Sequence, residues 1–257
     1  GGGVGINFSA LRPKDSPLSS GGYSSGAISF MHLFDTITEV VRQGGFRRGA
    51  SLFSLDYSHP EIFNFCRAKL TGDLTNANLS VLVTDKFMKK AVNGGQIELK
   101  FGNQIYTKVR AADILDLVSL GTWIRGDPGL LFYDRINQDN KNKEIPIITT
   151  NPCGEVPLFP YGACCLGSIN INKFIEGNEF NFTKFYEVVK LGGRALAHIN
   201  ILNSYPLPQI QKVMSEFQPQ GIGIMGFADT LIMLGIKYDS EPCLEFIKQL
   251  GKYYVQG

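Results

Sequence analysis

Charge is scarce in this sequence. Only 19% of its 257 residues are Asp, Glu, Lys or Arg, compared with about 25% in ordinary soluble domains, and the formal net charge is only +2. Proteins that bind polymeric nucleic acid usually gather Lys and Arg into a strongly basic surface. The composition therefore excludes that class, whereas a small anionic ligand needs only a few local charges and stays possible.

Long apolar runs and a leader pattern are missing as well. The stretch 222–236 is interrupted by Asp229 and falls short of the ~18 residues that a membrane-spanning helix needs. No basic start followed by an apolar segment marks a signal peptide, so we expect no membrane association. The chain begins with three glycines in place of Met and stops just after a helical pattern; we therefore expect a fragment of a longer protein.

Cysteine and histidine are too few, and too irregularly placed, for a disulfide framework or a zinc site. The five cysteines are odd in number, unevenly spaced and without a Cys-x-x-Cys pair, which favours a reducing, cytoplasmic compartment. Cys66 and Cys243 fall in helical patterns and are predicted to be packing residues. His59 precedes Pro60 and is predicted to cap a helix or to lie at the surface.

Glycine, in contrast, is abundant: 29 residues without a three-residue period, in a chain that is 44% hydrophobic. Collagen and disorder are thereby excluded, and the glycines must serve local backbone geometry. Strand patterns alternate with helical ones, which predicts an α/β fold with parallel pairing. Predicted strands cover 50–55, 79–84, 145–150, 169–171 and 221–224, a hairpin covers 97–106, and helices cover 30–41, 111–124, 182–202 and 227–234. Ser24 and Ser25 are predicted to cap the first of these helices and Asp85 a short one after the second strand.

Functional sites in such folds lie where strands end, and Asn151-Pro152-Cys153-Gly154-Glu155 follows a predicted strand. In an extended segment, side chains two residues apart point the same way. An amide, a thiol and a carboxylate would then share one face and could bind a hydroxylated substrate, move a proton and use sulfur for chemistry. The alternative is a buried cysteine in a turn beside a helix-capping glutamate.

Three further segments are candidates for a functional site. Cys164-Cys165 offers a redox thiol, or two packed core residues. The glycine-rich start, followed by Arg12, offers backbone N–H groups that could cradle an anion, or a close crossing of two backbones. The segment 42–49, RQGGFRRG, suits recognition of phosphate and base, or is a solvated helix end.

Together these segments resemble the catalytic α chain of ribonucleotide reductase over essentially the whole sequence. Five stretches carry the resemblance in order: GGGVGINFSALRP, RQGGFRRGA, LTNANLSVLVTDKFM, NPCGEVPLFPYGACCLGSIN and GIGIMGFADTLIMLGI. The NPCGE and FPYGAC segments are most similar to the adenosylcobalamin-dependent class II enzymes. The class I chains, which receive their radical from a metal-bearing partner subunit, are the near alternative.

The resemblance implies part of a ten-stranded α/β barrel, spanning 1–257, with residues 151–155 as its central finger loop. Cys153 would carry a thiyl radical that abstracts the ribose 3′ hydrogen, Glu155 would be the general base on the 3′ hydroxyl, and Asn151 would bind the ribose. Cys164 would be one of two reducing thiols, its partner lying upstream of residue 1, while Cys165 would only pack. Further substrate contacts would come from Gly2, Gly3 and Leu166. Arg12 would bind the triphosphate of an allosteric effector. The specificity loop, which relays the identity of the effector to the substrate site, would contain Arg42, Gln43, Arg47 and Ala50.

The resemblance also implies partners. A ribonucleotide substrate, a nucleoside triphosphate effector, a thioredoxin-type reductant and the missing half of the barrel are expected, with a homodimer formed through residues 30–41. On its own the chain should be inactive, and an open half-barrel should expose strand edges and apolar surface. Two alternatives remain, a non-catalytic nucleotide-binding module and an unrelated thiol protein.

Overall fold

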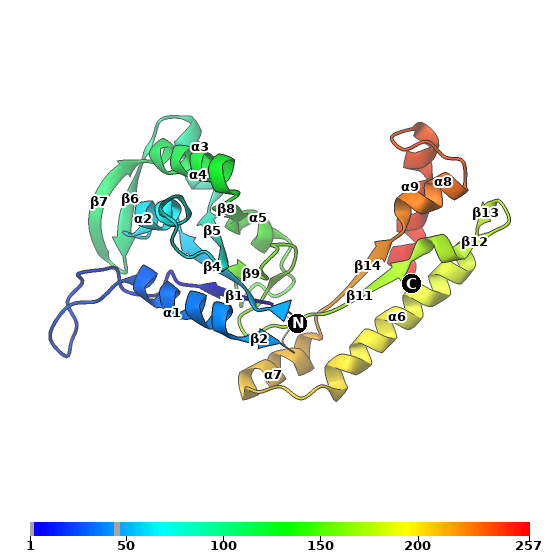
Figure 1. Ribbon diagram of the computed structural model, residues 1–257, viewed down its shortest axis with the longest axis horizontal. Coiled ribbons are helices and arrows are strands. Elements are labelled where there is room, and N and C mark those ends of the chain that lie inside the picture. Colours follow the sequence, from blue (N-terminus) through cyan, green and yellow to red (C-terminus); the bar gives the residue numbers. More distant parts are fainter. Residues whose placement is uncertain (1–2, 44–46) are drawn as a thin grey trace. The chain divides into compact units, whose positions relative to one another are not determined.

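The computed structural model describes residues 3–43 and 47–257, without the side chains of residues 42, 43, 47 and 48. The chain divides into two compact units, Gly1–Pro160 and Tyr161–Gly257 (Figure 1), and each is described by itself.

The N-terminal unit is built on a parallel four-stranded sheet with the order β1-β4-β5-β8. Its strands are β1 (Gly3–Asn7), β4 (Ala50–Asp56), β5 (Ala77–Val83) and β8 (Gly129–Phe132), and its helices are α1 (Ala27–Val40), α2 (Ile62–Arg67), α3 (Asp85–Val92), α4 (Ala111–Arg125) and α5 (Tyr133–Gln138). The described residues of this unit also form antiparallel strand pairs: β2 (Arg42–Gln43) with β3 (Arg47–Arg48), β6 (Gln96–Phe101) with β7 (Gln104–Arg110), and β9 (Thr149–Thr150) with β10 (Pro157–Leu158). The predicted α/β class with parallel pairing is confirmed.

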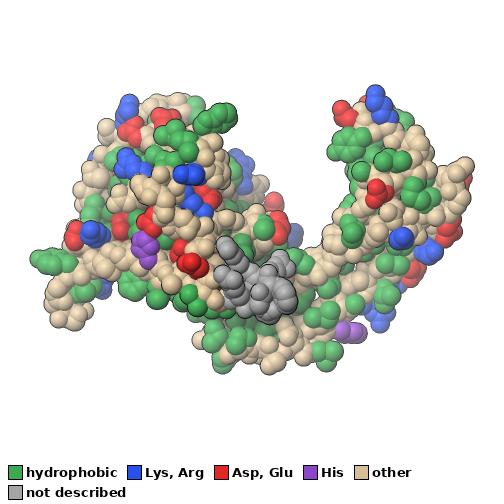
Figure 2. Space-filling model, in the orientation of Figure 1, with side chains coloured by type: hydrophobic (Ala, Val, Ile, Leu, Met, Phe, Trp, Pro, Cys, Tyr) green, Lys and Arg blue, Asp and Glu red, His purple; other side chains and the backbone are tan. Residues whose placement is uncertain are grey.

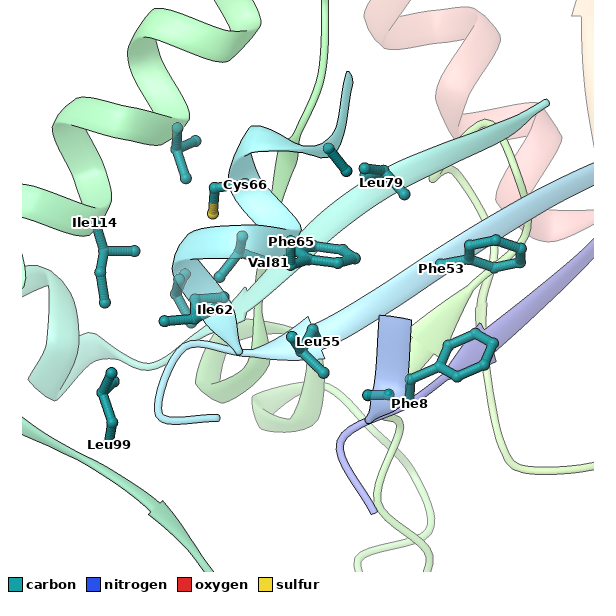
Figure 3. Packing of buried hydrophobic residues seen from close by; sticks show 14 of the residues in the cluster. Phe8, Phe53, Leu55, Ile62, Phe65, Cys66, Leu79, Val81, Leu99 and Ile114 are labelled. Carbon is teal, nitrogen blue, oxygen red and sulfur yellow. The ribbon is translucent and has the colours of Figure 1, made fainter. Parts of the chain in front are cut away.

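The two faces of this sheet differ in chemistry. Because side chains alternate along a strand, Phe53, Leu55, Leu79 and Val81 point to one face. There they pack with residues of α1, α2 and α4 in the main hydrophobic core (Figure 3). The opposite face carries polar residues of β1, β4 and β5, namely Asn7, Ser54, Asn78 and Ser80, together with Leu52 and Leu82. Helices α1, α2 and α4 therefore cover the apolar face, whereas α5 packs on the leucines of the opposite face and leaves its polar residues to another segment.

The C-terminal unit has a parallel pair, β11 (Cys165–Asn170) with β14 (Gln220–Met225), and a short antiparallel pair, β12 (Ile175–Glu176) with β13 (Glu179–Phe180). Its helices are α6 (Phe182–Leu202), α7 (Pro208–Phe217), α8 (Phe227–Met233) and α9 (Glu241–Gln256). Its core is aromatic: Phe174 and Phe185 meet edge to face at 5.5 Å, and Phe180 and Phe246 do so at 5.2 Å. The helix predicted over 182–202 is confirmed to the residue.

Both predicted helix caps were wrong, the first because a distant side chain takes the place of the local ones and the second by one residue. The α1 N-terminus is not capped by Ser24 or Ser25; the Glu61 carboxylate accepts from the Ala27 N–H at 2.7 Å instead. The cap of α3 is Thr84, one residue before Asp85.

The strand predicted over 145–150 shrinks to the two residues of β9. Asn137 explains this, because its side chain accepts from the Ile147 N–H and donates to the Ile147 carbonyl, at 2.9 Å each. The backbone of Ile147 is thereby satisfied without a strand partner.

Apolar side chains are exposed on both units (Figure 2). On α1 they include Phe30, Leu33 and Ile37, and on the β11–β14 pair Leu166, Ile224 and Met225. The expected exposure of apolar surface is thus confirmed. None of the helices in the described part of the chain is long and apolar enough to cross a membrane.

His59 is buried, 2% exposed, and the prediction of a surface position was wrong. Burial lowers the pKa of His59 below its ordinary 6.5, although a hydrogen bond to the Leu11 carbonyl opposes the shift. The unfolded chain therefore binds the proton first, and the stability should be complete above pH 6.5 and fall as the pH drops below it. A single proton limits the slope to about 1.4 kcal/mol per pH unit.

We therefore expect the free energy of unfolding, measured by urea titration between pH 7.5 and 5, to fall less steeply in His59→Gln than in the wild type. His198→Gln is the matched control, because His198 is exposed and its replacement should leave the slope unchanged. Equal slopes in all three proteins would contradict this assignment.

Candidate functional site

The segment that contains Cys153 is the loop of a short hairpin. Thr150 pairs with Pro157 and Thr149 with Leu158, which leaves residues 151–156 as the loop. Gly154 donates its N–H to the Asn151 carbonyl at 3.1 Å, so the chain turns at these residues. The predicted extended conformation was therefore wrong, and the shared face of three side chains does not follow from alternation.

Asn151 is turned inward and braces the loop. Its Oδ1 accepts from the Val156 N–H at 3.0 Å and from the Thr150 hydroxyl at 3.1 Å. Its Nδ2 has no hydrogen-bond partner among the described residues, so it can still donate to a ligand.

Cys153 and Glu155 are both exposed at the tip of this loop. Gly154 between them has φ +88°, and no atom lies within 4 Å of the position that a Cβ there would take. A thiol and a carboxylate thus lie two residues apart, on a loop with open space at its tip. The alternative of a buried cysteine in a turn is excluded by the exposure of Cys153, although the turn itself is real.

The loop is seated on the polar face of the sheet. Asn7 donates to the Ile148 carbonyl at 2.9 Å and to the Ser54 hydroxyl at 3.1 Å. Asn78 donates to the Pro152 carbonyl at 2.7 Å, directly before Cys153. Ser54 donates to the Thr149 hydroxyl at 3.2 Å, so side chains of β1, β4 and β5 hold the chain before, within and after β9.

Glycines in β1 allow the hairpin to approach the sheet this closely. A Cβ on Gly5 would lie 1.7 Å from the Thr150 carbonyl oxygen, and one on Gly3 would lie 2.3 Å from Cγ of Pro152. Gly3–Asn7 form strand β1, paired in register with β4. For the described glycines Gly3 and Gly5, the anion-cradling loop was therefore wrong and the close crossing of backbones is confirmed. Gly2 lies outside the described residues.

The second thiol candidate belongs to the other unit. Cys164 is half-buried just before β11, and its sulfur lies 3.8 Å from the position of a Cβ on Gly221. Cys165 is the first residue of β11, and Leu166 after it is exposed. No disulfide joins the five cysteines, all of which are described.

The residues predicted for an effector divide into two groups. Arg12 is exposed and forms no ion pair with a described carboxylate. Arg42 and Gln43 pair in β2–β3 with Arg48 and Arg47, but the side chains of this pair lie outside the described part. Ala50 is the first residue of β4 and pairs with Gly3 of β1. Residues 42–49 therefore lead directly into a strand that contacts the Cys153 hairpin through Ser54.

Sequence reasoning missed the residues that hold the site. The signal was present, because polar residues at alternate positions interrupt otherwise apolar strands, as Asn78 and Ser80 do in β5. Among the described residues there is no group of three or more His, Cys, Asp and Glu that could hold a metal ion.

Comparison with known proteins gives a consistent result. Residues 1–254 match the family model described as "Ribonucleotide reductase, barrel domain". The chain is 43% identical over 252 residues to the vitamin B12-dependent ribonucleoside-diphosphate reductase of Thermoplasma acidophilum, covering 95% of this chain and 33% of that protein. It is 39% identical over 266 residues to the protein of that name from Mycobacterium tuberculosis, covering 100% of this chain and 38% of the relative.

More distant relatives carry related names. The vitamin B12-dependent ribonucleotide reductase of Streptomyces coelicolor is 31% identical over 274 residues, which cover 94% of this chain and 28% of that protein. The chain thus spans about a third of the length of the curated relatives it matches, between 28% and 38% for these three.

Proposed function

Because this chain belongs to the ribonucleotide reductase family, we propose that it carries the radical-forming centre of an enzyme that reduces ribonucleotides to 2′-deoxyribonucleotides. The observation that supports this best is the placement of the Cys153 thiol and the Glu155 carboxylate on one loop braced against the sheet. A simple nucleotide-binding module needs neither group, so the catalytic alternative is favoured. The relatives' names favour ribonucleoside diphosphates as substrates.

In the proposed reaction each loop residue acts on the ribose. Cys153, as a thiyl radical, takes the 3′ hydrogen atom and later returns it. Glu155 accepts the proton of the 3′ hydroxyl, for which its carboxylate must come within hydrogen-bond reach. Asn151 donates its free Nδ2 hydrogens to a ribose hydroxyl. Gly2, Gly3 and Leu166 are proposed as further substrate contacts.

The electrons come from thiols. Cys164 and a second cysteine, which we propose lies elsewhere in the full-length protein, are oxidised together to a disulfide. The substrate gains those two electrons and its 2′ oxygen leaves as water. A thioredoxin-type reductant then restores the two thiols, and we propose the reducing cytoplasm as the location of the reaction.

The radical source proposed is adenosylcobalamin. When bound, it supplies the one-electron oxidation that converts a thiol into a thiyl radical. The loop fits such a group, because Cys153 is exposed and the space beside Gly154 is open. We assign no described residue as a cobalamin contact.

Regulation and assembly are proposed from the same family. Arg12 binds the triphosphate of a nucleotide effector, and Arg42, Gln43, Arg47 and Ala50 relay its identity to the substrate site. The exposed apolar residues of α1, Phe30, Leu33 and Ile37, form the contact of a homodimer. The rest of the barrel covers the remaining exposed strand surface.

An activity assay tests the proposal. The full-length protein that contains this chain is incubated with CDP or ADP, a dithiol reductant and adenosylcobalamin. We expect the deoxyribonucleotide to form only when cobalamin is present, and a metal chelator to leave the rate unchanged. Product formed only with a metal-bearing partner subunit would assign the chain to class I, and no product under either condition would refute the reductase function.

A further inference from the structure

The segment 8–26, which connects β1 to α1, is a long loop with a fixed internal shape. Asp15 donates its N–H to the Ser24 carbonyl at 2.9 Å, Ser24 donates to the Ser16 carbonyl at 2.8 Å, and Pro17 forms a bridge with Tyr23. The loop also reaches the β6–β7 hairpin, where the Ser16 and Tyr106 hydroxyls lie 2.8 Å apart. Arg12 lies at the entrance of this loop.

His59, which lies before α2, holds the loop directly before Arg12. Its Nε2 lies 3.0 Å from the Leu11 carbonyl oxygen, and its Nδ1 accepts from the Glu61 N–H at 3.2 Å. These two contacts fix one tautomer, with the hydrogen on Nε2. The ring is buried and meets Phe101 edge to face at 6.1 Å.

Glu61 holds the loop after Arg12 and again at its end. Oε2 of its carboxylate accepts from the Lys14 N–H at 3.2 Å and from the Ala27 N–H at 2.7 Å. Gly26, at φ +95°, comes so close that a Cβ there would lie 2.6 Å from Oε1 of Glu61. Glu61 as a whole is only 7% exposed, and its carboxylate forms no ion pair with a described cation.

A buried carboxylate is expensive unless it is fully hydrogen-bonded. Here two N–H groups and the N-terminus of the 14-residue helix α1 provide the compensation, since the helix dipole is positive at that end. The loop can therefore not leave this position without uncovering an unsatisfied charge. Its backbone is fixed on both sides of Arg12, while the Arg12 side chain is exposed and unpaired among the described residues.

We propose that His59 and Glu61 are positioning residues for the effector site, because they fix the backbone that presents Arg12 to a nucleoside triphosphate. This inference rests on the proposed role of Arg12. A backbone that is already ordered lowers the entropic cost of binding. Loss of the hydrogen bonds of either His59 or Glu61 should therefore weaken binding of the effector and leave the rate without effector unchanged.

Glu61→Gln provides the first test, because the amide keeps the shape and loses the charge and one acceptor oxygen. In the full-length protein, direct titration with dATP, dGTP and dTTP should show Kd raised about tenfold for the nucleotide that binds, as expected when two charge-assisted hydrogen bonds become neutral ones. Activity without effector should stay within about twofold. The matched control is Glu98→Gln, which removes an exposed ion pair with Lys108 and should change neither quantity.

His59 allows a test with two variants of similar size. Gln places an N–H donor where Nε2 lies and keeps the bond to Leu11, whereas Asn places an acceptor where Nδ1 lies and keeps only the bond to Glu61. We expect His59→Asn to weaken effector binding about tenfold and His59→Gln less than about threefold. If both weaken binding equally and lose effector-free activity in parallel, the residues are merely structural and the inference is overturned.

Arg12→Ala separates this inference from the function on which it rests. If Arg12→Ala weakens effector binding while Glu61→Gln and His59→Asn do not, the positioning role is wrong and the effector site stands. If Arg12→Ala binds every nucleotide normally, the assignment of Arg12 itself fails. Where a variant does not fold, hydrogen exchange in the wild type decides: bound nucleotide should slow exchange at the Lys14 and Ala27 amides, and unchanged exchange overturns the inference.

Discussion

Replacing Cys153 by serine is expected to abolish deoxyribonucleotide formation, with a loss of roughly 10⁴-fold or more, as when other enzymes lose the group that attacks the substrate. The side chains are nearly isosteric, but oxygen holds its hydrogen more strongly than sulfur and cannot carry the radical under the same conditions. Because Cys153 is exposed on its loop, the change removes no packing. The measurement is the rate of product formation by the purified full-length protein at saturating cobalamin and substrate.

Cys165→Ser is the matched control for this experiment. Cys165 is half-buried at the start of β11 and has no proposed chemical role, so its variant should keep a rate within about threefold of the wild type. Equal thermal unfolding midpoints of the two variants would show that Cys153→Ser acts on chemistry alone. If Cys153→Ser retained activity, the thiyl mechanism would be wrong whatever the rest of the site does.

How far the site could be predicted from sequence depended on the range of the interactions involved. Cys153 and Glu155 could be selected as candidates, because they lie only two residues apart in the chain. The conformation of their loop could not, because it depends on the Gly154 to Asn151 hydrogen bond and on Asn78, 74 residues away from Pro152. A period-two argument assumes an extended chain, and a turn of this kind breaks it.

In the fold, too, features that depend on local sequence could be predicted, whereas features that depend on distant contacts could not. Long helices with a regular apolar face, such as the one over 182–202, could be placed to the residue, since their signal is local and repeats. Helix caps and short strands could not, because Glu61 caps α1 from 34 residues away. The role of His59 was missed for the same reason: its two hydrogen-bond partners are backbone groups, one of them 48 residues distant at Leu11, and sequence patterns carry no trace of them.

Gly5→Ala is expected to have the second large effect, a fall in kcat of roughly 100-fold. The added methyl group would lie 1.7 Å from the Thr150 carbonyl oxygen, and a backbone carbonyl cannot rotate aside as a side chain does. The hairpin that carries Cys153 would have to move by more than about 1 Å, and a displacement of that size near reacting groups can cost about two orders of magnitude in rate. Overpacking should also lower the free energy of unfolding by about 1–3 kcal/mol.

Gly251→Ala in α9 is the matched control for this experiment. No atom lies within 4 Å of the position of a Cβ on Gly251, and alanine in a helix is about 1 kcal/mol more favourable than glycine. This variant should therefore be slightly more stable and fully active. Steady-state kinetics and thermal unfolding of both variants distinguish the cases, since a displaced loop lowers kcat more than a general loss of stability does. Wild-type kcat and stability in Gly5→Ala would mean that the hairpin does not lie against β1, and the proposed positioning of Cys153 by the polar face of the sheet would then fail.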